Sequence, residues 1–370
     1  MKGIILSLLA FFVVSHLHGQ GGPQVDTTLK MDFELYDPPS TLVVPEHPVT
    51  RAKFPFVDCH SHHWNMATQD LDKLIREMDT LNMGMIINLS GRGGPALAAM
   101  MENVKKYGYE DRILIFTNIE LRSIDEPDWA ENTVKQLEFD VEKGARGLKI
   151  YKSQGMSNVD KAGNRIKIND PRIAPVWEAC GRLGIPVIIH SADPKPFWDP
   201  LDENNERWLE LKLRPGRKRG ADDPAPWETI IAEQHDLFRK HPKTTFINAH
   251  MGWFANDLQK LGELLDEMPN MHVGIGAVIA ELGRQPRNAK KFFEKYQDRV
   301  LFAKDAYNPE EYHTYFRVLE TDDEYFPYYK KYHAFWRMYG LDLSDEVLKK
   351  LYYKNALRII PGKKAMIFPE

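Results

Sequence analysis

The fold is decided by the stretch Val57-Asp58-Cys59-His60-Ser61-His62-His63, which follows the apolar residues Phe54-Pro55-Phe56. The apolar residues predict a short buried strand, and the histidines come where that strand ends. His60 and His62 are two positions apart, so their rings point to the same side of an extended strand. Two imidazoles on one side can bind one divalent metal ion. The stretch therefore predicts a strand that ends in a metal site, with histidines of an ordinary turn as the alternative.

Short apolar segments alternate with amphipathic ones along the rest of the chain. Helical spacing is clear after Asp70, at Leu71, Leu74, Ile75, Met78 and Leu81. The expected strands are 56–60, 85–89, 113–118, 147–151, 186–190, 245–250, 271–275 and 300–305. Strands that alternate with helices in this way predict an α/β fold, a closed (β/α)8 TIM barrel. An open doubly wound sheet is the alternative, but it would normally carry a glycine-rich loop where this chain has histidines.

Two segments depart from the spacing of a regular barrel. Residues 191–244 are far longer than a simple crossover, so they predict a long insertion after strand 5, helical near 206–213. Loops at this end of a barrel build the active site, so we expect a lid, with a surface excursion as the alternative. The aromatic segment 325–336 predicts extra C-terminal helices on the flank of the barrel. An oligomer interface is equally typical of such a segment, and a homodimer is an open prediction.

The N-terminus is predicted to be a targeting segment. Lys2 precedes the apolar run 3–14, which is too short to span a membrane. Residues 1–19 therefore predict a cleaved signal peptide and an exported protein without a stable membrane anchor, and an uncleaved anchor is the alternative. Residues 20–50 are polar and contain several Pro and Gly residues, which predicts an extended N-terminal arm. Residues 51–370 form the expected barrel domain.

The composition favours a globular protein that acts on a small molecule. The 370 residues carry a formal net charge of -4, and 28% of them are charged. There is no basic excess, so we expect no nucleic-acid partner. Cys59 and Cys180 are the two cysteines. Because they lie in an expected strand and an expected helix, we predict two reduced, buried thiols.

Ionisable residues stand at the same end of several expected strands. They are Lys149 in strand four, His190 in strand five, His250 in strand six and Asp305 in strand eight. Polar residues at the carboxyl ends of barrel strands are typical of catalytic sites. A lone buried histidine often makes only a core hydrogen bond, but that explanation does not extend easily to several at one barrel mouth.

This pattern resembles the amidohydrolase superfamily, and specifically its amidohydrolase-related branch of metal-dependent decarboxylases and lactonases. The resemblance runs from Phe54 to Lys354-Asn355-Ala356. It implies that one divalent ion is held by His60, His62, His190 and Asp305, with His250 beside it. Three imidazoles and a carboxylate suit zinc, and manganese is a realistic substitute. The last strand departs from the branch, because Ala303-Lys304-Asp305 replaces Gly-Thr-Asp or Gly-Ser-Asp. We expect Lys304 to point away from Asp305.

The resemblance also implies a reaction, the hydrolysis of a small carboxylated lactone, ester or amide by a metal-activated water. Asp305 would be the general base, and His250 would polarise the carbonyl or position the water. Two other functions stay open. One is decarboxylation of an aromatic or enol acid at the same site. The other is an exported binding protein that has lost the chemistry.

Several further residues are candidates for contact with the substrate or the ligands. Lys149 and Arg284 are predicted to bind a substrate anion, and Arg92 is a weaker candidate for the same role. Trp64 is predicted to form a wall of the pocket, together with Trp198 and Trp253. All three tryptophans come just beyond strand ends. Asp58 is a candidate to orient a ligand imidazole. For each of these residues a structural role is the alternative.

Overall fold

The structure is a computed structural model that describes residues 25–331, 333, 335–362 and 368–369. The predicted signal peptide, residues 1–19, lies outside the described residues. The chain divides after Leu42 into two compact units. The described part of the first unit is mostly exposed and contains one short helix, η1 (Phe33–Leu35). Among the described residues, every helix is too short or too polar to cross a membrane.

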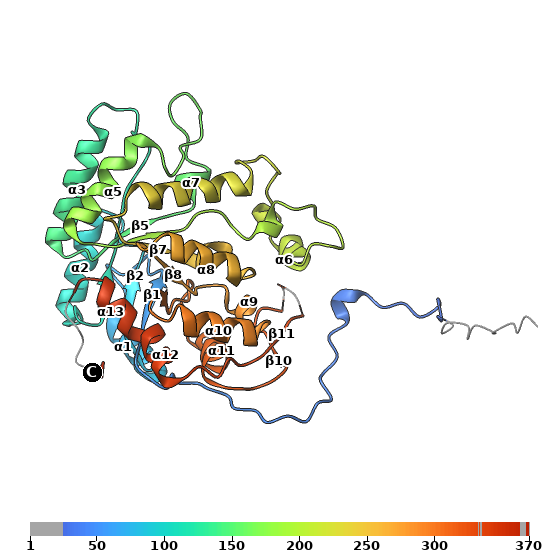
Figure 1. Cartoon of the computed structure of the whole chain (residues 1–370). Coiled ribbons are helices and arrows are strands. Elements are labelled where there is room, and N and C mark those ends of the chain that lie inside the picture. Colours follow the sequence, from blue (N-terminus) through green and yellow to red (C-terminus); the bar gives the residue numbers. More distant parts are fainter. Residues whose placement is uncertain (1–24, 332, 334, 363–367, 370) are drawn as a thin grey trace, which may run out of the picture. The chain divides into compact units, whose positions relative to one another are not determined.

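The second unit is built around a closed parallel barrel (Figure 1). Its strands are β1 (Phe56–Ser61), β2 (Met83–Asn88), β3 (Ile113–Ile115), β4 (Thr117–Asn118), β5 (Leu148–Ile150), β6 (Val187–Ile189), β7 (Phe246–Asn248), β8 (Met271–Gly274) and β9 (Val300–Leu301). They pair in chain order, β1 to β3 and then β4 to β9, all in parallel. β3 and β4 are two parts of one expected strand, interrupted at Phe116. The predicted TIM barrel is therefore confirmed.

The barrel closes where β1 meets the segment that follows β9. Cys59 N donates to Phe302 O at 3.1 Å, and Asp305 N donates to His60 O at 2.7 Å. The buried carboxylate of Asp58 accepts from His60 N at 3.0 Å and from Lys304 N at 3.1 Å, so it bridges both sides of the seam. Tyr312 donates its hydroxyl to the same carboxylate at 2.6 Å. These bonds bring the two most distant parts of the barrel together.

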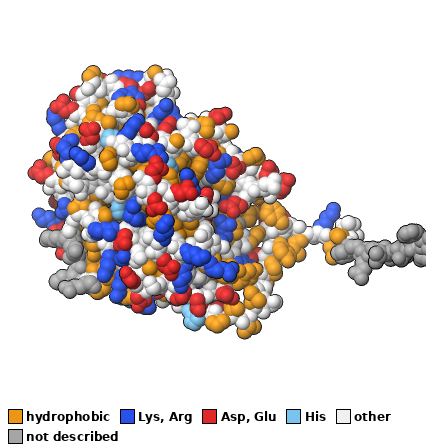
Figure 2. All heavy atoms as spheres, viewed as in Figure 1, with side chains coloured by type: hydrophobic (Ala, Val, Ile, Leu, Met, Phe, Trp, Pro, Cys, Tyr) orange, Lys and Arg blue, Asp and Glu red, His pale blue; other side chains and the backbone are white. Residues whose placement is uncertain are grey.

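The helices follow the strands and cover the barrel. They are α1 (Leu71–Leu81), α2 (Pro95–Tyr107), α3 (Trp129–Lys143), α4 (Ser153–Met156), α5 (Ala174–Leu183), α6 (Trp208–Leu213), α7 (Trp227–Lys240), α8 (Leu258–Glu267), α9 (Ile279–Gly283), α10 (Pro286–Lys295), α11 (Pro309–Glu320), α12 (Asp345–Lys349) and α13 (Asn355–Ile359). In α1 the side chain of Asp70 caps the N-terminus by accepting from Lys73 N, as its position predicts. The predicted apolar face of α1 is buried. The surface in Figure 2 shows acidic and basic side chains interspersed, in keeping with the small net charge.

The insertion after β6 has an apolar cluster of its own. The insertion contains α6, two short 3-10 turns and α7, and the start of α7 contributes to the cluster. Phe197, Trp198, Leu211 and Trp227 pack together there with small apolar neighbours. Trp198 therefore serves the packing of the insertion, with its Nε1 bonded to Ala225 O at 2.9 Å, and does not wall the metal site as predicted.

The C-terminal region is helical only in part. The extra helices α12 and α13 are present, joined by a π-helical turn over Lys350–Lys354. Asn355 in this region donates its amide to Val300 O at 2.8 Å and to Gln297 O at 2.7 Å, so its role is structural. The aromatic segment 325–336 was predicted to be helical, and that prediction is wrong. It starts in β10 (Phe326–Pro327), which pairs antiparallel with β11 (Arg337–Met338). Residues 332 and 334 lie outside the described part.

The seam at Asp58 yields a test of what holds the barrel closed. Tyr312→Phe removes a buried donor from the Asp58 carboxylate, so we expect the free energy of unfolding to fall by about 1–3 kcal/mol. Tyr353→Phe is the matched control, because the buried Tyr353 hydroxyl has no partner among the described residues. Urea denaturation followed by circular dichroism measures both variants. Equal losses of stability would contradict this role of Tyr312.

Candidate metal centre at the barrel mouth

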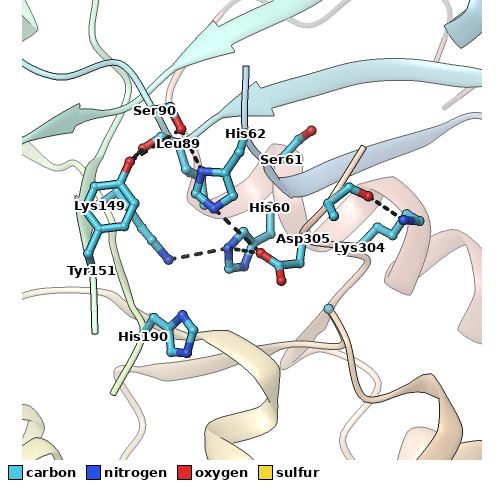
Figure 3. Close-up of polar contacts among 12 residues, drawn as sticks. His60, Ser61, His62, Leu89, Ser90, Lys149, Tyr151, His190, Lys304 and Asp305 are labelled. Carbon is cyan, nitrogen blue, oxygen red and sulfur yellow. Dashed lines mark hydrogen bonds and ion pairs between the residues drawn. The ribbon is translucent and has the colours of Figure 1, made fainter. Parts of the chain in front are cut away.

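Five ionisable side chains meet where the barrel strands end. Figure 3 shows His60 and His62 from the end of one strand, with Lys149, His190 and Asp305 approaching them from other parts of the barrel. His60 belongs to β1 and Lys149 to β5. His62 directly follows β1, His190 directly follows β6, and Asp305 lies in the segment after β9. His60 and Lys149 are buried. The sequence-predicted convergence of these strand ends is therefore present in the structure.

The distances between the donor atoms suit one small cation. His60 Nε2 lies 3.3 Å from Asp305 Oδ1, and His62 Nε2 lies 3.6 Å from the same oxygen. Ligands about 2.1 Å from a tetrahedral zinc ion are roughly 3.4 Å apart, so these spacings match that geometry. Among the described residues, His60, His250 and Asp305 also offer ligand atoms within 4.8 Å of one another. The residues present therefore fit a zinc ion.

His190 and His250 contact each other at the site. His250, predicted to stand beside the metal, belongs to the compact group with His60 and Asp305. His190, predicted to be a ligand, has its Nδ1 3.3 Å from His250 Nε2. The role of His190 as a ligand stays a prediction. His190 Nε2 is nevertheless buried without a hydrogen-bond partner among the described residues, as a free ligand atom would be.

A hydrogen bond to the backbone sets the tautomer of His250. Its Nδ1 lies 2.7 Å from Gly276 O, and a carbonyl only accepts, so Nδ1 carries the proton. His250 Nε2 of the neutral ring then holds a lone pair, which accepts from His190 Nδ1. By the same reasoning the unpartnered Nε2 of His190 also holds a lone pair. Both nitrogens of His250 are thus occupied, and the pair offers one free lone pair, that of His190 Nε2.

A strained turn holds His250 in this position. His250, Met251, Gly252 and Trp253 all have positive φ angles, between 52° and 64°. Left-handed backbone costs on the order of 1–3 kcal/mol at a non-glycine residue and is often found at functional sites. Trp253 stacks on the His250 ring at 4.6 Å and donates its Nε1 to Ser191 O at 2.9 Å. Trp253 therefore walls the site, as predicted.

Burial keeps the imidazoles neutral. It lowers the pKa of His60 and of His190 well below the usual value, with Lys149 and neighbouring histidines adding to the effect. Burial likewise lowers the pKa of His62 to about 4. Burial alone would raise the pKa of Asp305, but His250, His62 and Lys149 outweigh it and bring that pKa below its usual value. Neutral rings beside an ionised carboxylate are the protonation states that a metal ion requires.

Lys149 is a cation at the floor of the site. It is fully buried, and its Nζ lies 3.5 Å from His60 Nε2. Burial lowers the pKa of Lys149 to about 7, while Asp305 acts in the opposite direction. An amine that is partly charged at neutral pH can bind an anion here. Its place is consistent with the predicted contact to a substrate anion, which stays a prediction.

A second layer of residues fixes the orientation of His62. Ser90 Oγ lies 2.7 Å from His62 Nδ1, and Tyr151 donates its hydroxyl to Leu89 O at 3.0 Å. The rings of Tyr151 and Trp64 stack beside His62, each with centroids 5.8–5.9 Å from it. The sequence analysis missed Ser90 and gave Tyr151 no role. The signal for Ser90 was its position directly after the second strand.

Three other candidates have different partners from those expected. Arg284 is bonded to Glu206 at 3.1 Å and lies against the Trp336 ring, so its guanidinium is already engaged away from the histidines. Asp58 binds backbone amides and Tyr312, and does not orient an imidazole through its carboxylate. Lys304 pairs with Glu311 at 2.5 Å and so points away from Asp305, as predicted.

The depressed histidine pKa values predict how stability depends on pH. In the unfolded chain these rings take up protons near pH 6.5, whereas folded His62 does so only near pH 4. The unfolded state therefore binds more protons between these values, and the zinc-free protein loses stability as the pH falls from about 6.5 to about 4. For His62 alone the loss is on the order of 3 kcal/mol.

Urea denaturation at a series of pH values measures this effect. We expect His62→Asn to make the dependence less steep than in the unmodified protein. A slope that is the same in His62→Asn as in the unmodified protein would contradict the burial of a neutral His62.

Comparisons with known proteins agree with this fold. A putative amidohydrolase from Staphylococcus aureus is 15% identical, with a TM-score of 0.51 over 83% of this chain and 99% of that one. An uncharacterized TIM-barrel protein from Bordetella bronchiseptica is 14% identical, with a TM-score of 0.51 over 83% and 98%. A 2,6-dihydroxybenzoate decarboxylase is 14% identical, with a TM-score of 0.51 over 83% and 99%. These likenesses show the fold alone.

The sequence itself identifies the family. No curated protein matches the chain. A family model described as Amidohydrolase matches residues 121–362, which is more than half of the chain and includes Lys149, His190, His250 and Asp305. The chain therefore belongs to the amidohydrolase family.

Proposed function

We propose that this protein is a zinc-dependent hydrolase of a small carboxylated lactone, ester or amide. The observation that carries the proposal is the set of His60 Nε2, His62 Nε2 and Asp305 Oδ1, spaced 3.3 and 3.6 Å about one oxygen. Their burial and protonation states support a metal ion over a hydrogen-bond network of charged rings. When bound, zinc supplies a Lewis acid that lowers the pKa of a water toward neutrality.

The side chains of the site divide the remaining work. Asp305 is ionised at neutral pH, so it can accept a proton from the attacking water and return it to the leaving group. His250 holds its Nδ1 proton on Gly276 O and accepts from His190 Nδ1 at Nε2. With both nitrogens bonded, His250 can orient His190, whose Nε2 keeps a free lone pair. The expected role of His250 at the carbonyl or the water stays a prediction. Lys149 is placed to hold a carboxylate or the negative charge that develops on the carbonyl oxygen.

Decarboxylation of an aromatic or enol acid is the second candidate. The observation in its favour is Lys149, because a buried amine with a pKa of about 7 can deliver a proton to carbon. Proton delivery by Lys149, in place of attack by water, would then be the decisive step of the reaction. Both candidates need the same cation site, so they differ in product and not in ligands.

Turnover of a substrate panel separates the two candidates. The zinc-loaded protein is incubated with carboxylated lactones, esters and amides, and in parallel with aromatic and enol acids. We expect release of acid from the first group without release of carbon dioxide from the second. We also expect Asp305→Asn to lose at least about 100-fold in rate, as removal of a general base commonly does.

His63→Asn is the matched control for this experiment. It removes a histidine of the same sequence run, whose ring is bonded to Ser61 and Gln69 instead of Asp305. Its rate should stay close to that of the unmodified protein. Carbon dioxide without acid release would establish the second candidate. Bound zinc without any turnover across the panel would favour a binding protein.

A further inference from the structure

A cleft opens on the barrel rim next to the candidate metal centre. Its volume is about 810 Å3, and it lies over the ends of β2, β4 and β5. Trp64 and Tyr151, which stack beside His62, belong to its lining together with Arg92. The cleft is thus separated from the metal centre only by the rings of Trp64 and Tyr151 beside His62. A substrate whose reacting bond lies at the histidines would place its remote end here.

Arg92 is the only basic residue among the described residues that line this cleft. Its side chain is exposed, and within the described part of the chain its guanidinium makes no hydrogen bond or ion pair. The acidic groups of the lining have partners of their own. Glu126 pairs with Lys161 at 2.6 Å, and Glu120 lies 3.8 Å from Arg122. Buried Asp140 accepts from Thr117 at 2.6 Å, and Asp128 accepts from Asn132 Nδ2 at 2.7 Å.

The backbone holds Arg92 on the rim at a cost. Its φ angle is 58°, a left-handed conformation that glycine adopts more easily. Its N donates to Asn118 Oδ1 at 2.7 Å, and its carbonyl accepts from Asn118 N at 2.7 Å. The preceding Gly91 allows this close approach, because a Cβ there would lie 2.2 Å from Phe116 O. The loop is therefore fixed, and a long cation occupies a position that would suit glycine.

An aromatic wall faces the same space. Trp64 is 51% exposed and is the one exposed tryptophan among the described residues. It stacks on Tyr151 with ring centroids 5.9 Å apart. The positive charge of Arg92 also acts on the Tyr151 hydroxyl, whose pKa burial raises and Arg92 lowers. An apolar face beside an uncompensated guanidinium suits a ligand with a flat or apolar body and an anionic end.

We propose that Arg92 is a specificity-determining residue, which binds a substrate carboxylate remote from the reacting bond, with the body of the substrate against Trp64. This inference rests on the proposed function for the position of the reacting bond. Arg92 takes the role that the sequence predicted for Arg284, the selection of a carboxylated substrate. Arg284 is engaged by Glu206 and Trp336. Lys149 remains the anion contact inside the centre.

The first test measures binding and needs no turnover. Benzoate and its uncharged counterpart benzamide are titrated into the zinc-loaded protein, and affinities are read from NMR. We expect Arg92→Gln to weaken benzoate about 10- to 100-fold and to leave benzamide unchanged, because a charge-assisted hydrogen bond is lost. Arg92→Lys should restore part of the affinity. Added salt should weaken benzoate binding to the unmodified protein and have little effect on Arg92→Gln.

Two further variants keep the test decisive. Arg92→Gly removes the side chain but suits the positive φ, so a folded protein with the same loss of benzoate affinity supports the proposal. Arg122→Gln is the matched control, an exposed arginine of the same rim paired with Glu120. Unchanged benzoate affinity in Arg92→Gln and Arg92→Gly, or an equal loss for benzamide, would overturn the proposal.

The second test uses any substrate found by the panel, compared with its carboxamide analogue. We expect Arg92→Gln to raise KM for the carboxylate about 10- to 100-fold with kcat little changed. The carboxamide should show no such change. If the panel gives no turnover, the proposed function fails while the benzoate titration still decides the role of Arg92.

Discussion

The hydrogen bond from Asp305 N to His60 O, 2.7 Å long, is the contact on which the site depends. It joins the first strand to the segment after the last one, so it closes the barrel and brings a carboxylate to the histidines in a single step. The buried Asp58 reinforces the same seam by accepting from the amides of His60 and Lys304. Parallel pairing of strands thus converts a large separation in sequence into donor atoms less than 4 Å apart.

Burial then decides the chemistry of these donors. In water His60, His62 and His190 would be partly charged near pH 6.5. Inside the barrel mouth their charged forms are disfavoured, by loss of solvent and by Lys149, while Asp305 keeps its charge. A cluster of this kind lacks a positive partner for its carboxylate, apart from Lys149. A divalent cation would satisfy both the neutral rings and the carboxylate.

Much of the barrel could be predicted from the sequence, because buried parallel strands are short apolar runs and several of them are followed by a polar residue. The run at 113–118 was placed correctly, but its break at Phe116 depends on which neighbour each half pairs with. The aromatic segment 325–336 misled the helix prediction, since Tyr, Phe and Trp also favour strands, and Pro327 disfavours a helix. The aromatic residues alone do not distinguish a helix from a strand, and Pro327 was the local signal against a helix.

The site was predicted less completely, for a physical reason. Strand position shows which end of the barrel a side chain lies at, but not how far its ring reaches. The left-handed turn at His250–Trp253 sets the position of His250, which contacts His190, and no spacing rule contains that turn. Arg284 was predicted to bind a substrate anion, but it pairs with Glu206. Glu206 lies in the insertion after β6, whose position follows from tertiary packing. Ser90 and Tyr151 contact His62, and their positions after strands two and four showed that they lie at this end of the barrel but not which side chain they contact.

Anomalous X-ray diffraction from crystals of the zinc-loaded protein tests the central claim most directly. The account predicts one anomalous peak at the barrel mouth, about 2.0–2.2 Å from His60 Nε2, His62 Nε2 and a carboxylate oxygen of Asp305. A fourth contact to His190 or to His250 would settle which of the two completes the set. An ordered mouth without such a peak, or zinc bound elsewhere while these side chains bond only to one another, would contradict it.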